Sequence, residues 1–405
     1  MVHLGKNSRN RQPEKPVRKK AGYELCKSFR LPVILHLTTV HPRFDVRIFV
    51  KEAKTLASHR PYKVLLMVAD GKGCVIEEQG RVSIHDFGRL GGGRLGRLFI
   101  GPWRAFLAIC RIKPAVVHFH DPELIPLGML LKAIGYKVIY DIHEDVPTQT
   151  YAKHYIPKFI RHFVAIAMSS LERCAAKSLD VMIPATPKIA ERFPKNKTVV
   201  VQNFPICNEL IALRKIPYED RDLSFAYVGG IAKIRGAFEM IRAFECLSDI
   251  KRARLELAGE FSPSRLEDEL RMLPGWASVN YHGQVAREQV AHLLGGVRAG
   301  LVTLHATANY LDSYPVKMFE YMSAGIPVIA SNFPLWRQII DREGCGLIVD
   351  PLNPQAIAKA MRWILDHPAE AEAMGHRGRQ AVGCTYNWDG EATKIMRLYD
   401  KLLAR

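Results

Sequence analysis

Short apolar runs recur along almost the whole chain, and segments with helical periodicity separate most of them. The first two, 31–37 and 62–68, are mostly apolar, which is typical of parallel strands buried on both faces. Because strands and helices alternate, we expect an α/β protein with doubly wound parallel sheets. Further strands are predicted at 82–85, 115–120, 137–141 and 181–184, and a second series at 223–228, 253–258, 278–281, 299–304, 326–330 and 346–349.

The two series of strands predict two domains, as the length of 405 residues also does. The segment 204–222 is polar, carries two prolines and lacks periodicity, so we place the boundary there. The expected organisation is a basic lead over 1–30, domains over 31–205 and 206–385, and a terminal helix over 386–405. Two such domains leave a cleft at the carboxyl ends of both sheets, where ligands bind.

The net charge of +18 is uneven, since residues 1–30 hold nine lysines and arginines against two glutamates. Such a lead attracts polyanions, namely nucleic acid, anionic lipid headgroups or a phosphorylated substrate. A solvated, disordered tail is the alternative interpretation. The eight cysteines are scattered singly and no apolar run reaches the roughly 18 residues that cross a bilayer, so we expect a cytoplasmic protein.

The segment 94–113 has an amphipathic helical pattern. Arg97, Arg104 and Arg111 share one side, and Pro102 would kink this helix or mark its start. The apolar residues of the opposite side are Leu95, Leu98, Phe99, Trp103, Phe106, Leu107 and Cys110. A basic helix of this kind can lie in a membrane interface. We favour the commoner arrangement, in which the apolar face packs into the core.

The block 311–330 carries the most informative pattern. Ser313 and Pro315 suit a helix start and Gly325 its end, and the amino end of a helix binds phosphate. Lys317 in the first turn is a cation placed against the helix dipole, which indicates an anionic ligand. The block resembles the signature of glycosyltransferase family 4, whose two acids eight residues apart match Asp312 and Glu320. The resemblance implies that Asp312 contacts the donor sugar and Glu320 the ribose.

Upstream, the pattern of 227–244 predicts a strand, a glycine turn at Gly229 and Gly230, and a helix. The glycines of such a turn allow backbone N–H groups to approach a phosphate closely. It resembles the glycine loop of the same family, and Arg235 matches one of its two basic positions. Gly230 occupies the other, which is a departure from the family; Lys317 or Lys233 can substitute. Glu260 and Gln284 follow later strands and are further candidate donor contacts.

In the first half, two strands end in polar clusters. One cluster holds His118, His120, Asp121 and Glu123, and the other Asp141, His143, Glu144 and Asp145. Histidine and carboxylate groups are also metal ligands, so a metal site is an alternative interpretation. Both strings resemble acceptor-side motifs of a family 4 branch, and the loop 41–49 resembles that branch too. The resemblance implies that His120, Asp121, His143 and Glu144 line the cleft and that Asp45 and Arg47 face it.

The resemblance covers about residues 31–405 and implies a GT-B fold, with two Rossmann-like domains facing a cleft and a terminal helix that crosses back to the first. It implies a retaining glycosyltransferase without metal or other cofactor, with His120, Asp121, Asp312 and Glu320 as catalytic residues. The expected partners are a nucleotide-sugar donor, a glycan or lipid-linked acceptor and an anionic membrane surface, in polysaccharide or glycolipid synthesis. A nucleotide-sugar epimerase and a non-catalytic nucleotide-sugar-binding protein are alternatives; nucleic acid is not expected, since only the charge suggests it.

Overall fold

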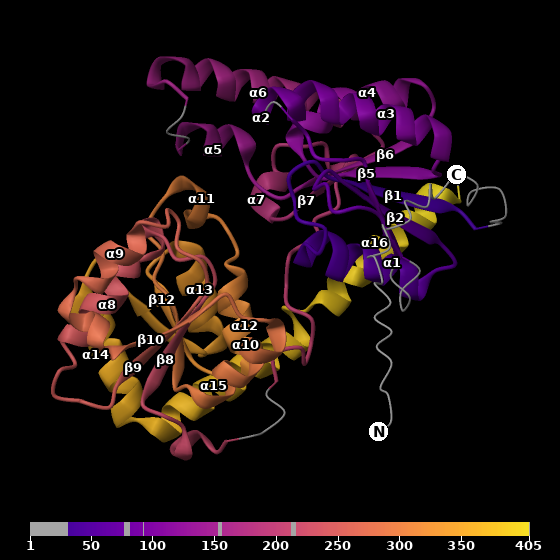
Figure 1. Ribbon diagram of the computed structural model, residues 1–405. Coiled ribbons are helices and arrows are strands. Elements are labelled where there is room, and N and C mark those ends of the chain that lie inside the picture. Colours follow the sequence, from indigo (N-terminus) through magenta and orange to yellow (C-terminus); the bar gives the residue numbers. More distant parts are fainter. Residues whose placement is uncertain (1–30, 77–81, 92, 153–155, 212–215, 405) are drawn as a thin grey trace, which may run out of the picture.

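The computed structural model describes residues 31–76, 82–91, 93–152, 156–211 and 216–404, and they form two α/β domains side by side (Figure 1). The basic lead lies outside the described residues. The first domain contains a seven-stranded sheet in the order β3-β4-β2-β1-β5-β6-β7, in which β3 is antiparallel. Its strands are β1 Val33–Leu37, β2 Lys63–Val68, β3 Val75–Ile76, β4 Val82–Asp86, β5 Val116–Phe119, β6 Lys137–Ile142 and β7 Val181–Pro184.

Helical segments cover both faces of this sheet (Figure 1). They are η2 Val46–Ala53, α1 Lys54–His59, α2 Gly93–Leu95, η3 Gly96–Ile100, α3 Gly101–Ile112, η4 Pro122–Leu124, α4 Ile125–Ala133, α5 Val146–Ala152, α6 Lys158–Ser178, α7 Pro187–Ala190 and η5 Lys195–Lys197. Helices α3, α4 and α6 pack on one face through small and aliphatic side chains, and η2 and α1 pack on the other. Residues 116–119 of β5 are buried throughout, as expected for a central parallel strand, and residues 181–184 of the edge strand β7 are buried too.

The second domain contains a six-stranded parallel sheet in the order β10-β9-β8-β11-β12-β13. Its strands are β8 Ser224–Val228, β9 Arg254–Ala258, β10 Val279–Gly283, β11 Ala299–Val302, β12 Val328–Ser331 and β13 Gly346–Val349. Its helical segments are η6 Tyr218–Asp220, η7 Lys233–Arg235, α8 Ala237–Glu245, α9 Leu266–Arg271, η8 Pro274–Ser278, α10 Arg287–Gly296, α11 Ala308–Leu311, α12 Val316–Ala324, α13 Pro334–Glu343, α14 Pro354–Asp366 and α15 Pro368–Cys384. The two doubly wound domains confirm the predicted fold class.

The terminal helix α16, Trp388–Leu403, crosses back and packs against the first sheet (Figure 1). Trp388, Ile395 and Tyr399 belong to the core on the same face as η2. The two crossings between domains are bonded to each other, because the backbone N–H of Trp388 donates to the carbonyl of Pro205 over 2.8 Å. The two segments that connect the domains are therefore in contact with each other.

The preferred interpretation of the segment 94–113 is wrong. Its helix buries the small residues Gly101, Ala105 and Ala108 together with Ile109, while the large apolar side chains at 95, 98, 99, 103 and 107 are exposed. The packing around Gly101 is close, since a Cβ there would lie 3.0 Å from Leu90 Cδ1 and 3.3 Å from Thr39 Cγ2. The wider π-helical turn of η3 lies directly before α3 and accommodates Pro102 without a break in the helix.

Among the described residues, no helix combines the length and the apolar character needed to cross a membrane.

Candidate active site

A cavity of about 730 Å³ lies where the carboxyl ends of the first sheet face the start of α12. The first domain contributes every acceptor-side residue expected from the sequence, namely Asp45, Arg47, His120, Asp121, His143 and Glu144. The second domain contributes Ser313, Tyr314 and Val316, so the amino end of α12 borders the same space. The cleft predicted from two facing sheets is therefore present, and its walls are polar.

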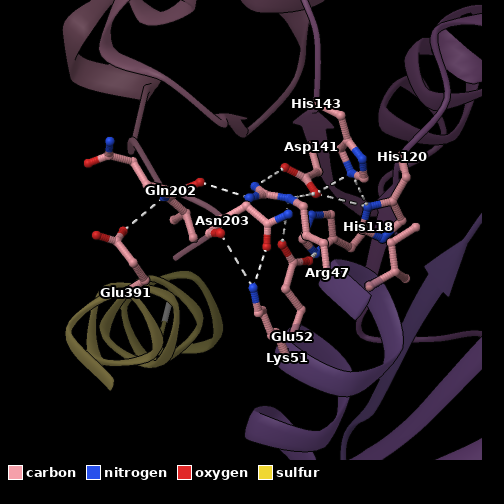
Figure 2. Close-up of polar contacts among 12 residues, drawn as sticks. Arg47, Lys51, Glu52, His118, His120, Asp141, His143, Gln202, Asn203 and Glu391 are labelled. Carbon is pink, nitrogen blue, oxygen red and sulfur yellow. Dashed lines mark hydrogen bonds and ion pairs between the residues drawn. The ribbon is translucent and has the colours of Figure 1, made fainter. Parts of the chain in front are cut away.

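Asp141, at the end of β6, is the centre of the polar wall (Figure 2). Its carboxylate receives a bidentate pair from Arg47, at 2.9 and 2.6 Å, and lies 3.0 Å from Nδ1 of His120 and 2.8 Å from Nε2 of His143. Burial raises the pKa of Asp141, but Arg47 and His143 outweigh it and hold that pKa well below its usual value. Arg47 borders the cavity as expected, but its guanidinium points to Asp141, with which it forms a bidentate ion pair.

Behind this wall lies a second, fully buried cluster of His36, Glu52, His118 and Tyr399. Nδ1 of His36 is 3.0 Å from Nε2 of His120, and Nδ1 of His118 is 2.9 Å from the hydroxyl of Tyr399. Burial lowers the pKa of both His36 and His118 well below the usual value and raises that of Glu52 well above it. Burial thus favours the neutral form of these three groups, and His36 and His118 contact His120 from behind.

Two sets of donor atoms within this region have metal-like spacing. His36, Glu52, His118 and His120 form one set and His120, Asp141 and His143 the other, each with ligand atoms within 4.8 Å of one another. The guanidinium of Arg47 lies 2.6 Å from Asp141 and 3.2 Å from Glu52, so it already brings positive charge to both carboxylates. The positive charge of Arg47 beside both acids disfavours a metal cation there; a metal-free site stays a prediction.

His41 is a cavity residue that the sequence motifs did not single out. Its imidazole lies between two carboxylates, 3.4 Å from Asp45 and 3.6 Å from Asp121, and it is partly exposed. Burial lowers the pKa of His41, but the hydrogen bond to Asp45 and the charge of Asp121 raise it above the usual value overall. Asp121 is also fixed by Thr38 and by the backbone N–H of Thr39, at 2.8 and 2.6 Å. The two carboxylates thus favour the protonated form of His41 in the acceptor-side wall.

On the donor side, the glycine turn brings two cations together. Nη1 of Arg235 donates to the carbonyl of Gly230 over 3.0 Å, and Nζ of Lys317 donates to the hydroxyl of Tyr227 over 2.7 Å. The hydroxyl of Tyr227 in turn donates to that same carbonyl, which links the two cations. A Cβ on Gly229 would lie 2.6 Å from Cε of Lys317, so only glycine allows this approach.

Gly230, the departure from the family pattern, has a structural reason. A Cβ at this position would lie 2.6 Å from Nη1 of Arg235, so the guanidinium occupies the space that a side chain would take. Burial, followed by the charge of Arg235, lowers the pKa of Lys317 from 10.5 to about 7. Among the described residues, neither Arg235 nor Lys317 forms a salt bridge with a carboxylate. The pair therefore lacks the negative charge that would stabilise it.

Glu320 lies on α12 with its side chain 12% exposed, and it is neither core nor open to solvent. Its carboxylate accepts a hydrogen bond from Nη1 of Arg287 over 2.7 Å, and Arg287 also forms a bidentate pair with Glu209. Arg287, the first residue of α10, carried no motif signal, and only the fold brings it to Glu320. A ribose held by Glu320 would share the carboxylate with this guanidinium.

The other donor-side residues are surface groups. Asp312 follows α11 and is exposed, and Glu260 and Gln284 are exposed after β9 and β10. Their expected donor contacts stay predictions. The expectation that Ser313 caps the helix is wrong, because α12 begins at Val316 with Pro315 before it, and the Ser313 hydroxyl donates to the carbonyl of Tyr310 instead.

Comparison with known proteins places this geometry in a family. Residues 211–381 match the family model described as glycosyl transferases group 1. This part of the chain is a group 1 glycosyltransferase domain. An uncharacterized glycosyltransferase of Methanocaldococcus jannaschii is 26% identical over 187 residues, which are 46% of this chain and 47% of that protein. The D-rhamnosyltransferase WbpZ of Pseudomonas aeruginosa is 31% identical over 102 residues, 25% of this chain and 26% of that protein. The chain thus spans less than half the length of these two relatives.

Solved structures resemble this chain over both of its domains. Sucrose-phosphate synthase from Thermosynechococcus elongatus has a TM-score of 0.71 at 18% identity, over 92% of this chain and 99% of that chain. Anabaena HepE in complex with UDP-glucose has a TM-score of 0.69 at 13% identity, over 91% and 100%. The overall fold is therefore GT-B, as the resemblance implied.

Proposed function

We propose that this chain transfers a sugar from a nucleotide-sugar donor to a glycan or lipid-linked acceptor. The observation that carries the proposal is the pair of cations, Arg235 and Lys317, that meets at the glycine turn without a carboxylate partner among the described residues. A diphosphate supplies the missing charge, and guanidinium groups bind it in bidentate fashion. The position of α12 supports this, since its first turn carries Lys317 and borders the cavity at Val316, and the amino end of a helix binds phosphate.

In this proposal the sugar leaves its diphosphate while Arg235, Lys317 and the amino end of α12 stabilise the growing negative charge. No metal is needed, because the protein itself provides two cations. Glu320 holds the ribose and Asp312 approaches the sugar. The acceptor hydroxyl attacks on the face from which the diphosphate departs, so the anomeric configuration is retained. Closure of the two domains excludes water and limits hydrolysis of the donor.

The acceptor binds in the cavity of the first domain, against His41, His143 and Glu144, while the buried His120 and Asp121 hold that wall in shape. Support for the class of acceptor comes from relatives. One is named as a D-rhamnosyltransferase, and another, from Mycobacterium tuberculosis, as a GDP-mannose-dependent phosphatidylinositol monomannoside mannosyltransferase, 29% identical over 119 residues. We therefore place the reaction in surface polysaccharide or glycolipid synthesis, at the cytoplasmic face of a membrane.

The first experiment is a thermal-shift screen of UDP, GDP and their sugars, because a ligand that binds the folded state raises the melting temperature. Arg235→Met and Glu320→Gln should each weaken binding by about tenfold or more, the loss of a charged hydrogen bond. Lys251→Met, on the far surface of the second domain, is the matched control. Binding of every nucleotide unchanged in Arg235→Met would refute the proposal.

Product analysis then separates the reaction classes. Release of nucleoside diphosphate that depends on a membrane-lipid extract, with an α-linked product from an α-linked donor, is the expected result. Conversion of the donor sugar without acceptor would identify an epimerase instead. Tight nucleotide binding with no turnover on any extract would identify a binding protein.

A further inference from the structure

The outer face of the first domain carries an unusual concentration of exposed apolar side chains. On η3 and α3, Phe99 is 69% exposed and Trp103 61%, and on α6 Phe159 is 78% and Phe163 68% exposed. The full set, here called the apolar face, comprises Leu95, Leu98, Phe99, Ile100, Trp103, Leu107, Leu130, Ile134, Tyr151, Phe159, Phe163 and Ile166. A contiguous set of this kind marks an interaction surface.

The helices that carry these residues form one layer. Helix α4 contacts both α3 and α6, and all three cover the same side of the sheet, opposite to α16 (Figure 1). Phe159, Phe163 and Ile166 are spaced by four and three residues, so they form a single stripe on α6. The inner side of each helix is already packed against the sheet, which leaves the apolar face without a partner within the described residues.

The charge of this surface has one sign. Segments 93–112, 125–134, 146–152 and 158–171 contain no aspartate or glutamate, whereas they contain seven lysines and arginines. The nearest acid on α6, Glu172, is buried and bonded to Arg192. A second copy of this chain would bring two basic faces together, which repel. A lipid bilayer with anionic headgroups offers both an apolar interior and negative charge, so it complements the face.

The apolar face lies next to the opening of the cleft. Arg97 on η3, and Val146 and Gln149 on α5, line the cavity that the acceptor-side residues border. The elements that expose Phe99 and Tyr151 thus also form the rim of the cleft. A molecule embedded by its lipid tail beside the apolar face would present its headgroup to that opening.

We propose that the apolar face docks the enzyme on an anionic membrane surface, so that a lipid-linked acceptor enters the cleft directly from the bilayer. The aromatic and aliphatic side chains of η3, α3 and α6 insert at the headgroup boundary, and the arginines between them contact the phosphates. The entry of the acceptor rests on the proposed function; the docking itself does not, and it is tested without donor or acceptor.

The test measures binding of the full-length protein to sedimenting vesicles of phosphatidylcholine, with and without phosphatidylglycerol. The double variant Phe99→Ser/Trp103→Ser should lower the partition coefficient at least about tenfold. The pair Phe159→Ser/Phe163→Ser should do the same. The double variant Arg104→Glu/Arg111→Glu should lower it at least about tenfold on anionic vesicles, since each charge contributes about fivefold.

Matched controls come from the second domain. Met272→Ser and Leu352→Ser remove side chains that are 84% and 60% exposed, and Arg252→Glu reverses an exposed charge. All three should bind vesicles as the unaltered protein does. Because the altered residues are exposed, melting temperatures should stay within a few degrees. UDP binding, measured on the same samples, reports on the proposed function separately.

Three results would overturn the docking proposal. One is the absence of binding of the unaltered protein to anionic vesicles. Another is equal binding by the variants of the apolar face, which would assign any membrane contact to another basic segment such as residues 1–30. The last is a stable dimer in solution that the same variants convert to monomer, which would make the face an interface between copies.

Discussion

Lys317 gives the proposed donor site a measurable pH dependence. Its ammonium group lies 4.0 Å from the centre of the Tyr227 ring, and burial together with the charge of Arg235 lowers its pKa to about 7. A diphosphate beside both cations raises that pKa again, because it favours the charged form. Binding of UDP therefore requires the protonated lysine, and above pH 7 the protein must take up a proton when it binds.

The magnitude follows from the pKa. Below pH 7 Lys317 is protonated before binding, and affinity does not depend on this group. Above pH 7 the protonated fraction falls about tenfold per pH unit, so the Kd for UDP should rise about tenfold between pH 8 and pH 9. The terminal phosphate of UDP loses its last proton near pH 6 (about the value for phosphate esters), so it does not obscure this range.

Isothermal titration calorimetry in two buffers of different ionisation enthalpy measures both quantities. We expect uptake of about one proton per UDP at pH 8 and the stated rise in Kd. Lys317→Met should bind more weakly at pH 7 and lose the pH dependence, whereas Lys251→Met should keep it. Affinity that is flat from pH 7 to 9, or a slope that persists in Lys317→Met, would refute the reasoning.

The stability of the free protein should increase as the pH rises above 7, whereas its affinity for UDP should decrease. The folded-state pKa of Lys317 lies below its usual value of 10.5, so the unfolded chain binds this proton more tightly. The resulting destabilisation is complete below pH 7 and disappears as the pH rises towards 10.5. Lys317→Met should therefore increase the free energy of unfolding at pH 7, by on the order of a few kcal/mol, while it weakens donor binding.

Two further predictions concern Arg47 and Gly230. Arg47→Met leaves Asp141 as a buried charge without its main partner and should lower the free energy of unfolding by about 3–5 kcal/mol in urea titrations; the double variant with Asp141→Asn should lose less than the sum of the two single losses. Gly230→Lys restores the family's basic residue, yet its Cβ displaces the guanidinium of Arg235, so UDP should bind about tenfold more weakly. Tighter binding by Gly230→Lys would contradict our explanation of this departure.

Much of the architecture was predictable because it depends on local patterns. Short apolar runs identified twelve of the thirteen strands among the described residues, and the exception, β3, has two residues. The family resemblance implied that the polar clusters after β5 and β6 line the cleft, and His120, Asp121, His143 and Glu144 do line one cavity. Local sequence patterns do not show which residues form hydrogen bonds or ion pairs with these side chains.

The orientation of the helix at 94–112 shows where prediction from periodicity fails. The pattern showed one apolar side and one side with three arginines, and hydrophobicity favoured burial of the apolar side. The structure buries the side that holds Gly101, Ala105, Ala108 and Ile109, where a Cβ on Gly101 would lie 3.0 Å from Leu90 Cδ1. Which side packs inward depends on the shape of the neighbouring segments, which no single-sequence pattern contains, and Phe99 and Trp103 stay outside.

The sequence by itself determined the order of strands and helices and the two domains, because each follows from periodicity and from the geometry of parallel sheets, while the motifs it shares with a known family indicated the residues of the first domain that line the cleft. Only the tertiary structure decided the pairings: Arg47 with Asp141, Arg287 with Glu320, and Lys317 with Tyr227. These pairs join residues that are 94, 33 and 90 positions apart. Their energies depend on burial and distance, which arise only when the whole chain has folded.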